Sequence, residues 1–214
     1  MDTFKVTMNL CSPLVTQGGY MTLDALLAAL IFEATGDLQK AHHEIPLQQT
    51  QGVWHGSAAN LTLWHEGRAG FVANLRASHD LDLNLIAQNK QGNTHAKLGL
   101  TRRRDYGAVM NSYKTYSASE IAWYGQGDAQ AVEQWLRQVH FIGKRRASGF
   151  GQVQSLRIEP DELDGVTGFF GEPLRPVPVE LFKGDPHALK ADAAWRPAYW
   201  DPVNRAICHV PAGL

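Results

Sequence analysis

The sequence predicts an α+β protein, a ferredoxin-like βαββαβ domain with a central β-hairpin insertion and an extended C-terminal segment. The candidate elements run strand, helix, several strands, helix and strand, and they include too few helices for a doubly wound parallel sheet. We expect residues 1–160 to form the domain, with the insertion at about 83–115, and residues 161–214 to pack on the same domain. With 44% hydrophobic and 19% charged residues, the chain of 214 residues can bury a core.

The first strand and helix are predicted from two different periodicities. Residues 3–11 roughly alternate apolar and polar side chains, as a half-buried strand does, and Ser12-Pro13 ends the run. Thr22 then stands at an N-cap position, and Gly36 is a plausible C-cap. Between them, apolar residues recur at helical spacing and predict one buried face: Leu23, Leu26, Leu27, Leu30 and Ile31.

The middle and the end of the chain predict further strands, a second helix and a C-terminal strap. Residues 50–100 contain several short strand candidates, and residues 113–124 are aromatic-rich and strand-like. Asp128 can cap a second helix, and a last strand is expected at 152–158. The last fifty residues carry seven of the ten prolines, which restrict the backbone to extended conformations. Their aromatic and basic side chains suit either a strap on the domain, which we favour, or a partner surface: Trp195, Arg196, Tyr199 and Trp200.

Several protein classes find no support in the sequence. No apolar run reaches the roughly 18 residues that span a bilayer, and the N-terminus does not resemble a secretory signal. We therefore expect a cytoplasmic protein without membrane contact, whose two cysteines, Cys11 and Cys208, are reduced and buried. No Walker loop, Gly-x-Gly-x-x-Gly or Cys-x-x-Cys motif occurs, so we expect no cofactor.

The net charge of −1, from 20 basic and 21 acidic residues, hides an uneven distribution. Residues 97–157 hold ten cations and four acids, a local charge of +6 within a remainder of −7. Two basic clusters lie in this segment, Arg102-Arg103-Arg104 and Lys144-Arg145-Arg146. If they converge, they form one phosphate-binding surface, because each cation near a phosphate adds salt-dependent affinity. The first cluster could equally be a solvated edge strand that charge protects from aggregation.

The sharpest motif is the segment Ile-Gly-Lys-Arg-Arg-Ala-Ser-Gly-Phe-Gly-Gln-Val at 142–153. We call residues 143–151 the glycine loop. Its three glycines allow positive φ and close backbone approach, its cations can hold phosphates, and its backbone N–H groups could do the same. Phe150 could pack inward or stack on a base. The plainer interpretation is a solvated turn between a helix and a strand.

This loop resembles the glycine-rich loop of the RAMP superfamily of CRISPR-associated proteins, in which basic residues precede Gly-Phe-Gly-x-Val. The N-terminal strand, the Leu-Asp-Ala-Leu-Leu-Ala helix at 23–28 and the Ala-Trp-Tyr-Gly-x-Gly-Asp segment at 122–128 agree with this resemblance. In its length and in this Leu-Asp helix, the chain is most similar to the Cas-five-like subunit of type IV CRISPR effector complexes.

The resemblance implies an RRM-like domain that binds the 5′ handle of the crRNA, caps the backbone filament, and contacts backbone and large subunits. Target DNA is a further partner that it allows. The insertion at about 83–115 would be the thumb. The residues expected to contact RNA are Arg102, Arg103 and Arg104, together with Gly143, Lys144, Arg145, Arg146, Ser148, Gly149, Phe150 and Gly151.

Two alternatives stay open at this stage. A RAMP endoribonuclease would need a general base for the ribose 2′-OH, and His42, His43 or His140 could serve, assisted by Tyr20 and Lys144. We expect no catalysis, because adjacent histidines in a polar connection are usually solvated and a type IV system usually has a separate endonuclease. His55 and His65 lack metal-ligand spacing, so we expect no metal site. The other alternative is a ferredoxin-like interaction or metabolite-binding domain.

Overall fold

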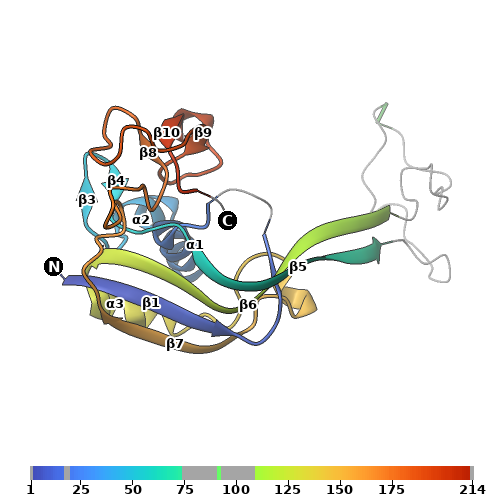
Figure 1. The fold of residues 1–214 in the computed structure, drawn as a ribbon. Helices are drawn as coiled ribbons and strands as arrows, with labels where there is room; N and C mark the ends of the chain where they lie inside the picture. Colours follow the sequence, from blue (N-terminus) through green and yellow to red (C-terminus); the bar gives the residue numbers. More distant parts are fainter. Residues whose placement is uncertain (1, 17–19, 74–90, 93–108, 213–214) are drawn as a thin grey trace, which may run out of the picture. The chain divides into compact units, whose positions relative to one another are not determined.

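The computed structural model describes residues 2–16, 20–73, 91–92 and 109–212. Two compact units make up the chain: Met1–Glu66 with Thr115–Leu214, and Gly67–Lys114. The structure is mixed and rich in strands, with few helices, which is compatible with the expected α+β class (Figure 1). None of the helices in the described residues is long and apolar enough to cross a membrane.

The main sheet has the strand order β2-β6-β1-β7, and β5 pairs with β6. Strand β1 is antiparallel to both neighbours, and Met8 pairs with Ile121 on one side and Leu156 on the other. The strands of this sheet are β1 (Asp2–Leu10), β2 (Leu14–Val15), β5 (Asn60–Ala73), β6 (Val109–Gly127) and β7 (Val153–Pro160).

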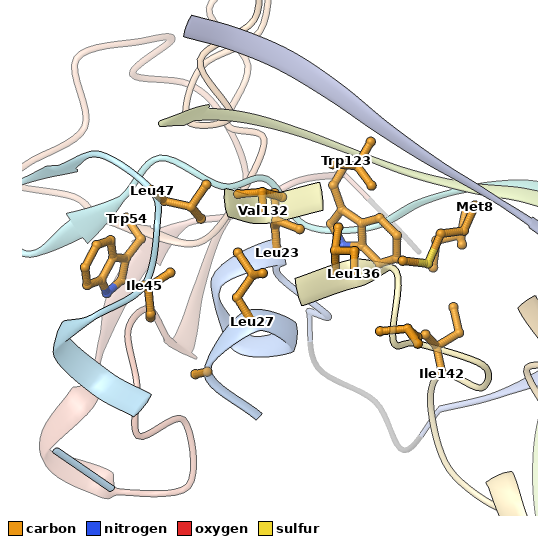
Figure 2. Close-up of a cluster of buried hydrophobic side chains, with 14 of the residues drawn as sticks. Met8, Leu23, Leu27, Ile45, Leu47, Trp54, Trp123, Val132, Leu136 and Ile142 are labelled. Atoms are coloured by element: carbon orange, nitrogen blue, oxygen red, sulfur yellow. The ribbon is translucent and has the colours of Figure 1, made fainter. Parts of the chain in front are cut away.

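One face of this sheet forms the core because the apolar residues of β1 alternate with polar ones. Phe4, Val6, Met8 and Leu10 are buried, whereas Lys5 between them is partly exposed. Their side chains join those of the helices in a single cluster that includes Trp123 (Figure 2). The helices are α1 (Leu23–Thr35), α2 (Leu38–His43) and α3 (Ala129–Leu136).

Helix α1 begins and ends where the sequence predicts, but its apolar face is narrower than expected. Gly36 adopts φ 67° and its N–H bonds Phe32 O. Leu23, Leu27 and Ile31 are buried in the core. Leu26 and Leu30 are only half-buried at its margin, because the apolar stripe is wider than the surface that it covers.

The C-terminal segment contains more regular structure than the extended strap we expected. Strands β8 (Val177–Pro178), β10 (Arg205–His209) and β9 (Lys190–Ala194) form an antiparallel sheet in that order. A separate hairpin joins β3 (Gln49–Thr50) to β4 (Val53–Trp54). Among the cysteines, Cys208 is buried as expected, but Cys11 is exposed, and both are free.

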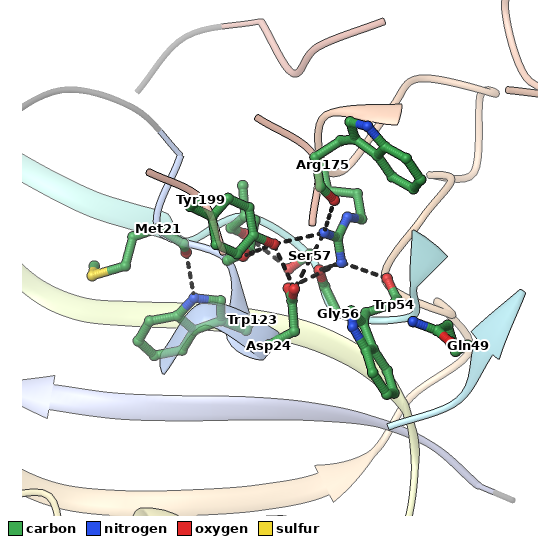
Figure 3. Close-up of polar contacts among 12 residues, drawn as sticks. Met21, Asp24, Gln49, Trp54, Gly56, Ser57, Trp123, Arg175 and Tyr199 are labelled. Atoms are coloured by element: carbon green, nitrogen blue, oxygen red, sulfur yellow. Dashed lines mark hydrogen bonds and ion pairs between the residues drawn. The ribbon is translucent and has the colours of Figure 1, made fainter. Parts of the chain in front are cut away.

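A buried ion pair fastens this segment to the start of α1 (Figure 3). Arg175 Nη1 lies 3.0 Å from Asp24 Oδ1, and both side chains are fully buried. The Tyr199 hydroxyl donates to Asp24 and accepts from Arg175 and from the Thr22 hydroxyl. Burial disfavours the charged guanidinium, but Asp24 beside it raises the pKa of Arg175. Because the Thr22 hydroxyl is engaged with Tyr199, it makes no capping hydrogen bond to α1.

Candidate nucleic-acid interface

The glycine loop is closed at its base by pairing between its two ends. Ile142 is buried in the core, its N–H donates to Gly151 O at 2.9 Å, and Val153 N–H donates to His140 O. The loop is also tied to β2 and to the residue before it, because Lys144 N–H donates to Val15 O and Gly151 N–H to Pro13 O, each at 2.8 Å. The core thus holds the base of the loop in one position.

Two of the three glycines are required by contacts within the protein itself. A Cβ at Gly151, where φ is +69°, would lie 2.0 Å from Ile142 O. A Cβ at Gly143 would lie 2.6 Å from Val15 O. Gly149 differs, since its φ of +84° favours glycine but open space surrounds the position of its missing Cβ. Only Gly149 therefore leaves room for another molecule beside the backbone.

The backbone N–H groups near the tip of the loop bond within the loop. Ser148 N–H donates to Arg145 O, Gly149 N–H to Arg146 O, and Phe150 N–H to Arg145 O. These bonds form a short 3₁₀ turn at Arg146–Ser148. They leave these three N–H groups poorly placed to cradle a phosphate, in contrast to the sequence-based suggestion, so anion binding rests on the side chains.

The cationic side chains lie on the surface of this turn. Lys144 and Arg146 are exposed, as is Ser148, whereas Arg145 and Phe150 are half-buried. Arg145 has φ 60°, a left-handed conformation that is uncommon outside glycine. Arg146 Nη2 lies 3.0 Å from Glu33 Oε1 at the end of α1, with about half of each side chain exposed (52% and 53%). Three cations and one acid therefore gather on a backbone that the core holds in place.

The outer face of the sheet is charge-balanced in comparison. Arg157 on β7 lies 3.9 Å from Glu120 and 4.0 Å from Glu159. Lys5 stands over the ring of Tyr124, 5.9 Å from its centroid. Because nearby carboxylates offset the charge of Arg157, this face attracts phosphate less than the glycine loop does.

The second basic cluster, Arg102, Arg103 and Arg104, lies outside the described residues, as does most of the expected insertion at 83–115. Of the tyrosines that follow this cluster in the sequence, Tyr116 is buried in the core, so it serves packing. Tyr113 meets Phe71 edge-on, with ring centroids 5.8 Å apart.

The residues considered for catalysis occupy separate places. His42 and His43 end α2, where burial, and then the neighbouring His43, lower the pKa of His42. His140 lines a cavity beside the glycine loop, whereas Tyr20 lines another beside the C-terminal segment. Within the part of the chain that the structure describes, no group of three or more His, Cys, Asp or Glu residues could hold a metal ion.

These features define an α+β protein with one compact, rigidly held basic loop. A family model for CRISPR type IV associated proteins matches residues 2–211, nearly the whole chain. The chain belongs to this family, Csf3, and membership implies a role in the type IV CRISPR effector complex together with its other components. No curated protein matches the chain.

Proposed function

We propose that this protein is the non-catalytic crRNA-binding subunit of its type IV complex, holding the 5′ handle of the guide and capping the backbone filament. In this proposal the chain is a Cas-five-like member of the RAMP superfamily. Family membership supplies the type IV context, and the handle-binding role is our inference from the glycine loop.

The observation that carries the proposal is the cationic turn on a fixed base. Lys144, Arg145 and Arg146 are consecutive, and the close contacts of Gly143 and Gly151 hold the loop on which they stand. Preorganised cations lose less conformational freedom when they bind a phosphate, so they bind it more tightly than mobile ones. Such a site suits a nucleic-acid segment held in one register.

The strand order supports a ferredoxin-like topology for the core. In a βαββαβ unit, the first strand lies between the third and the fourth, and the second pairs with the third. Here β1 lies between β6 and β7, and β5 pairs with β6. Helix α1 precedes β5 and helix α3 precedes β7, as this plan requires.

Binding of a repeat-derived RNA to the full chain tests the proposal. We expect salt-sensitive binding by fluorescence anisotropy, with the RNA intact after incubation in EDTA. The variant Lys144→Gln, Arg145→Asn, Arg146→Gln removes three cations and keeps a residue that tolerates positive φ at position 145. Three lost phosphate contacts should weaken binding about tenfold or more and reduce the slope of log K against log salt by about 2.

A matched control removes three exposed cations elsewhere on the protein. The variant Lys40→Gln, Lys183→Gln, Lys190→Gln carries the same charge change and should bind RNA nearly as the wild type does. Equal losses in both variants would reduce the glycine loop to a nonspecific contributor. If the wild type cleaves the RNA, and His42→Ala or His43→Ala abolishes this cleavage, the non-catalytic assignment is overturned.

Co-expression with the other type IV components and a CRISPR array tests the place of the subunit in the complex. We expect one copy of the chain per guide RNA in the purified particle, measured by native mass spectrometry. Several copies per guide would instead indicate a subunit of the backbone filament.

A further inference from the structure

A groove runs along the surface of α1 beside the glycine loop. It has a volume of about 370 Å³, within the range of about 300–1,000 Å³ that small-molecule sites occupy. Its α1 wall is one helical stripe, which Leu26, Ala29, Leu30 and Glu33 form at i, i+3, i+4 and i+7. These include the two leucines that the core leaves half-buried.

The groove combines apolar walls with a polar end. Leu26 and Leu30 face it from α1, and Phe141 faces it from the segment before the glycine loop. The polar end contains the pair of Glu33 and Arg146, whose side chains are about half exposed, and Gln138 and His140 also line the groove. An aromatic ring and leucine side chains suit a flat heterocycle, which can stack on one and pack on the others.

The carboxylate of Glu33 restricts which part of an RNA can enter. A phosphate in the groove would face this negative charge, so the backbone is disfavoured there. Guanine suits the pair, since its N1–H and N2–H₂ groups can donate to a carboxylate and its O6 and N7 can accept from an arginine. Glu33 has a second carboxylate oxygen and Arg146 has further N–H donors, so both can contact a base without separating.

We propose that this groove is a base-specific subsite that takes a guanine of the bound RNA, next to the phosphates held by Lys144 and Arg145. The inference rests on the proposed RNA-binding function and adds to it a base and the residues that select it. Arg146 then has two roles, because it contributes charge to the loop and closes the polar end of the groove.

Anisotropy titrations of the full chain with labelled 12-mer oligouridine, and with the same oligomer carrying one central guanosine, test the subsite. We expect the guanosine oligomer to bind the wild type about tenfold more tightly, as one bidentate base contact provides. An oligomer with adenosine at that position should bind like oligouridine, since adenine offers no pair of N–H donors along one edge.

Two variants locate the preference in the groove. Ala29→Trp fills the groove from an exposed helix position, and Glu33→Gln replaces the carboxylate with an amide. Both should abolish the guanosine preference, so each variant should bind the guanosine oligomer and oligouridine with equal affinity. Ala34→Trp, on the exposed side of the same helix, and Glu44→Gln, an exposed acid elsewhere, are the matched controls and should keep the preference.

The outcomes separate this inference from the proposed function. Salt-sensitive binding of both oligomers with equal affinity would overturn the guanine subsite and leave the RNA-binding role standing. A preference that survives Ala29→Trp would place the base elsewhere on the protein and overturn the subsite. Failure of the wild type to bind any RNA would overturn both.

Discussion

Helix α1 carries two carboxylates that pair with arginines at the same distance in opposite surroundings. Asp24 in the first turn lies 3.0 Å from Arg175, and both side chains are fully buried. Glu33 in the last turn of the helix lies 3.0 Å from Arg146, with about half of each side chain exposed. The same pairing chemistry therefore serves two purposes in one helix, and burial decides which.

The buried pair is expensive to form and is well provided with partners. Arg175 donates to the carbonyl oxygens of Trp54, Gly56 and Trp195 as well as to Asp24. Of the three guanidinium nitrogens of Arg175, only Nε has no hydrogen-bond partner among the described residues. Removal of either partner would strand a charge away from water, so this pair fixes the fold. The exposed pair keeps its solvation, so its groups remain available to a ligand.

Loss of Arg175 should have the largest effect on stability. Arg175→Met leaves Asp24 buried without its cation, and we expect the free energy of unfolding to fall by about 3–5 kcal/mol. Urea denaturation followed by tryptophan fluorescence measures the change. Arg205→Met is the control, because its pair with Asp192 is exposed, and it should cost less than about 1 kcal/mol.

The double variant Asp24→Leu, Arg175→Met sharpens this test. It removes both charges, so its loss of stability should be smaller than the sum of the two single losses. Additive losses would mean that the carbonyl and hydroxyl contacts, rather than the ion pair, hold the segment on α1.

The glycine loop should show the next largest effect, and its glycines should differ among themselves. In Gly151→Ala, the positive φ and the contact of the new Cβ with Ile142 O should together cost about 3 kcal/mol. Gly149→Ala faces only the positive φ and should cost about 1 kcal/mol. Equal unfolding free energies for the two variants would contradict the role of Gly151 in closing the base of the loop.

The sequence predicts those parts of the fold that depend on local pattern. Helical spacing identifies Leu23, Leu27 and Ile31, and the turn residues Gly36 and Asp128 mark helix ends that the structure confirms. The role of Arg175 was not predicted, because its partner Asp24 lies 151 positions away and no spacing connects them. Asp24 was the available clue, an acid at a position where the helix faces the core.

The candidate site shows the same division. The motif identifies the glycine loop, but only the structure separates Gly143 and Gly151, which the chain's own contacts require, from Gly149. The link between Arg146 and Glu33 is also nonlocal, since 113 positions separate the two residues. Sequence patterns thus locate turns and faces, whereas contacts between distant residues need the tertiary structure.

The side chain of Asp164 is more exposed than that of Asp24 and less exposed than that of Glu33, so its replacement should have an intermediate effect on stability. Burial opposes its charge, but His55, 3.4 Å away, and the N–H groups of Val166 and Thr167 lower the pKa of Asp164 below its ordinary value. A lowered pKa stabilises the fold above about pH 4, and this contribution is lost as the pH falls through the pKa of the folded state. Asp164→Asn should therefore lower the free energy of unfolding at neutral pH and have progressively less effect in acid.

Denaturant titrations of wild type and variant at several pH values measure this convergence. Asp2→Asn, at an exposed position, should give a difference near zero throughout. A loss with Asp164→Asn that is the same at neutral and acid pH would show that side-chain shape, rather than ionisation, explains the effect.

The smallest effect should come from the exposed pair. Glu33→Gln should change the free energy of unfolding by no more than about 0.5 kcal/mol, because a half-exposed ion pair gains little over its solvated parts. The measurement is urea denaturation at low and high salt, beside Asp24→Asn at the other end of the same helix. A loss near that of Asp24→Asn would make Glu33 and Arg146 part of the scaffold. A negligible loss, together with loss of the guanosine preference, would show that α1 uses one carboxylate to hold the fold and the other to select a base.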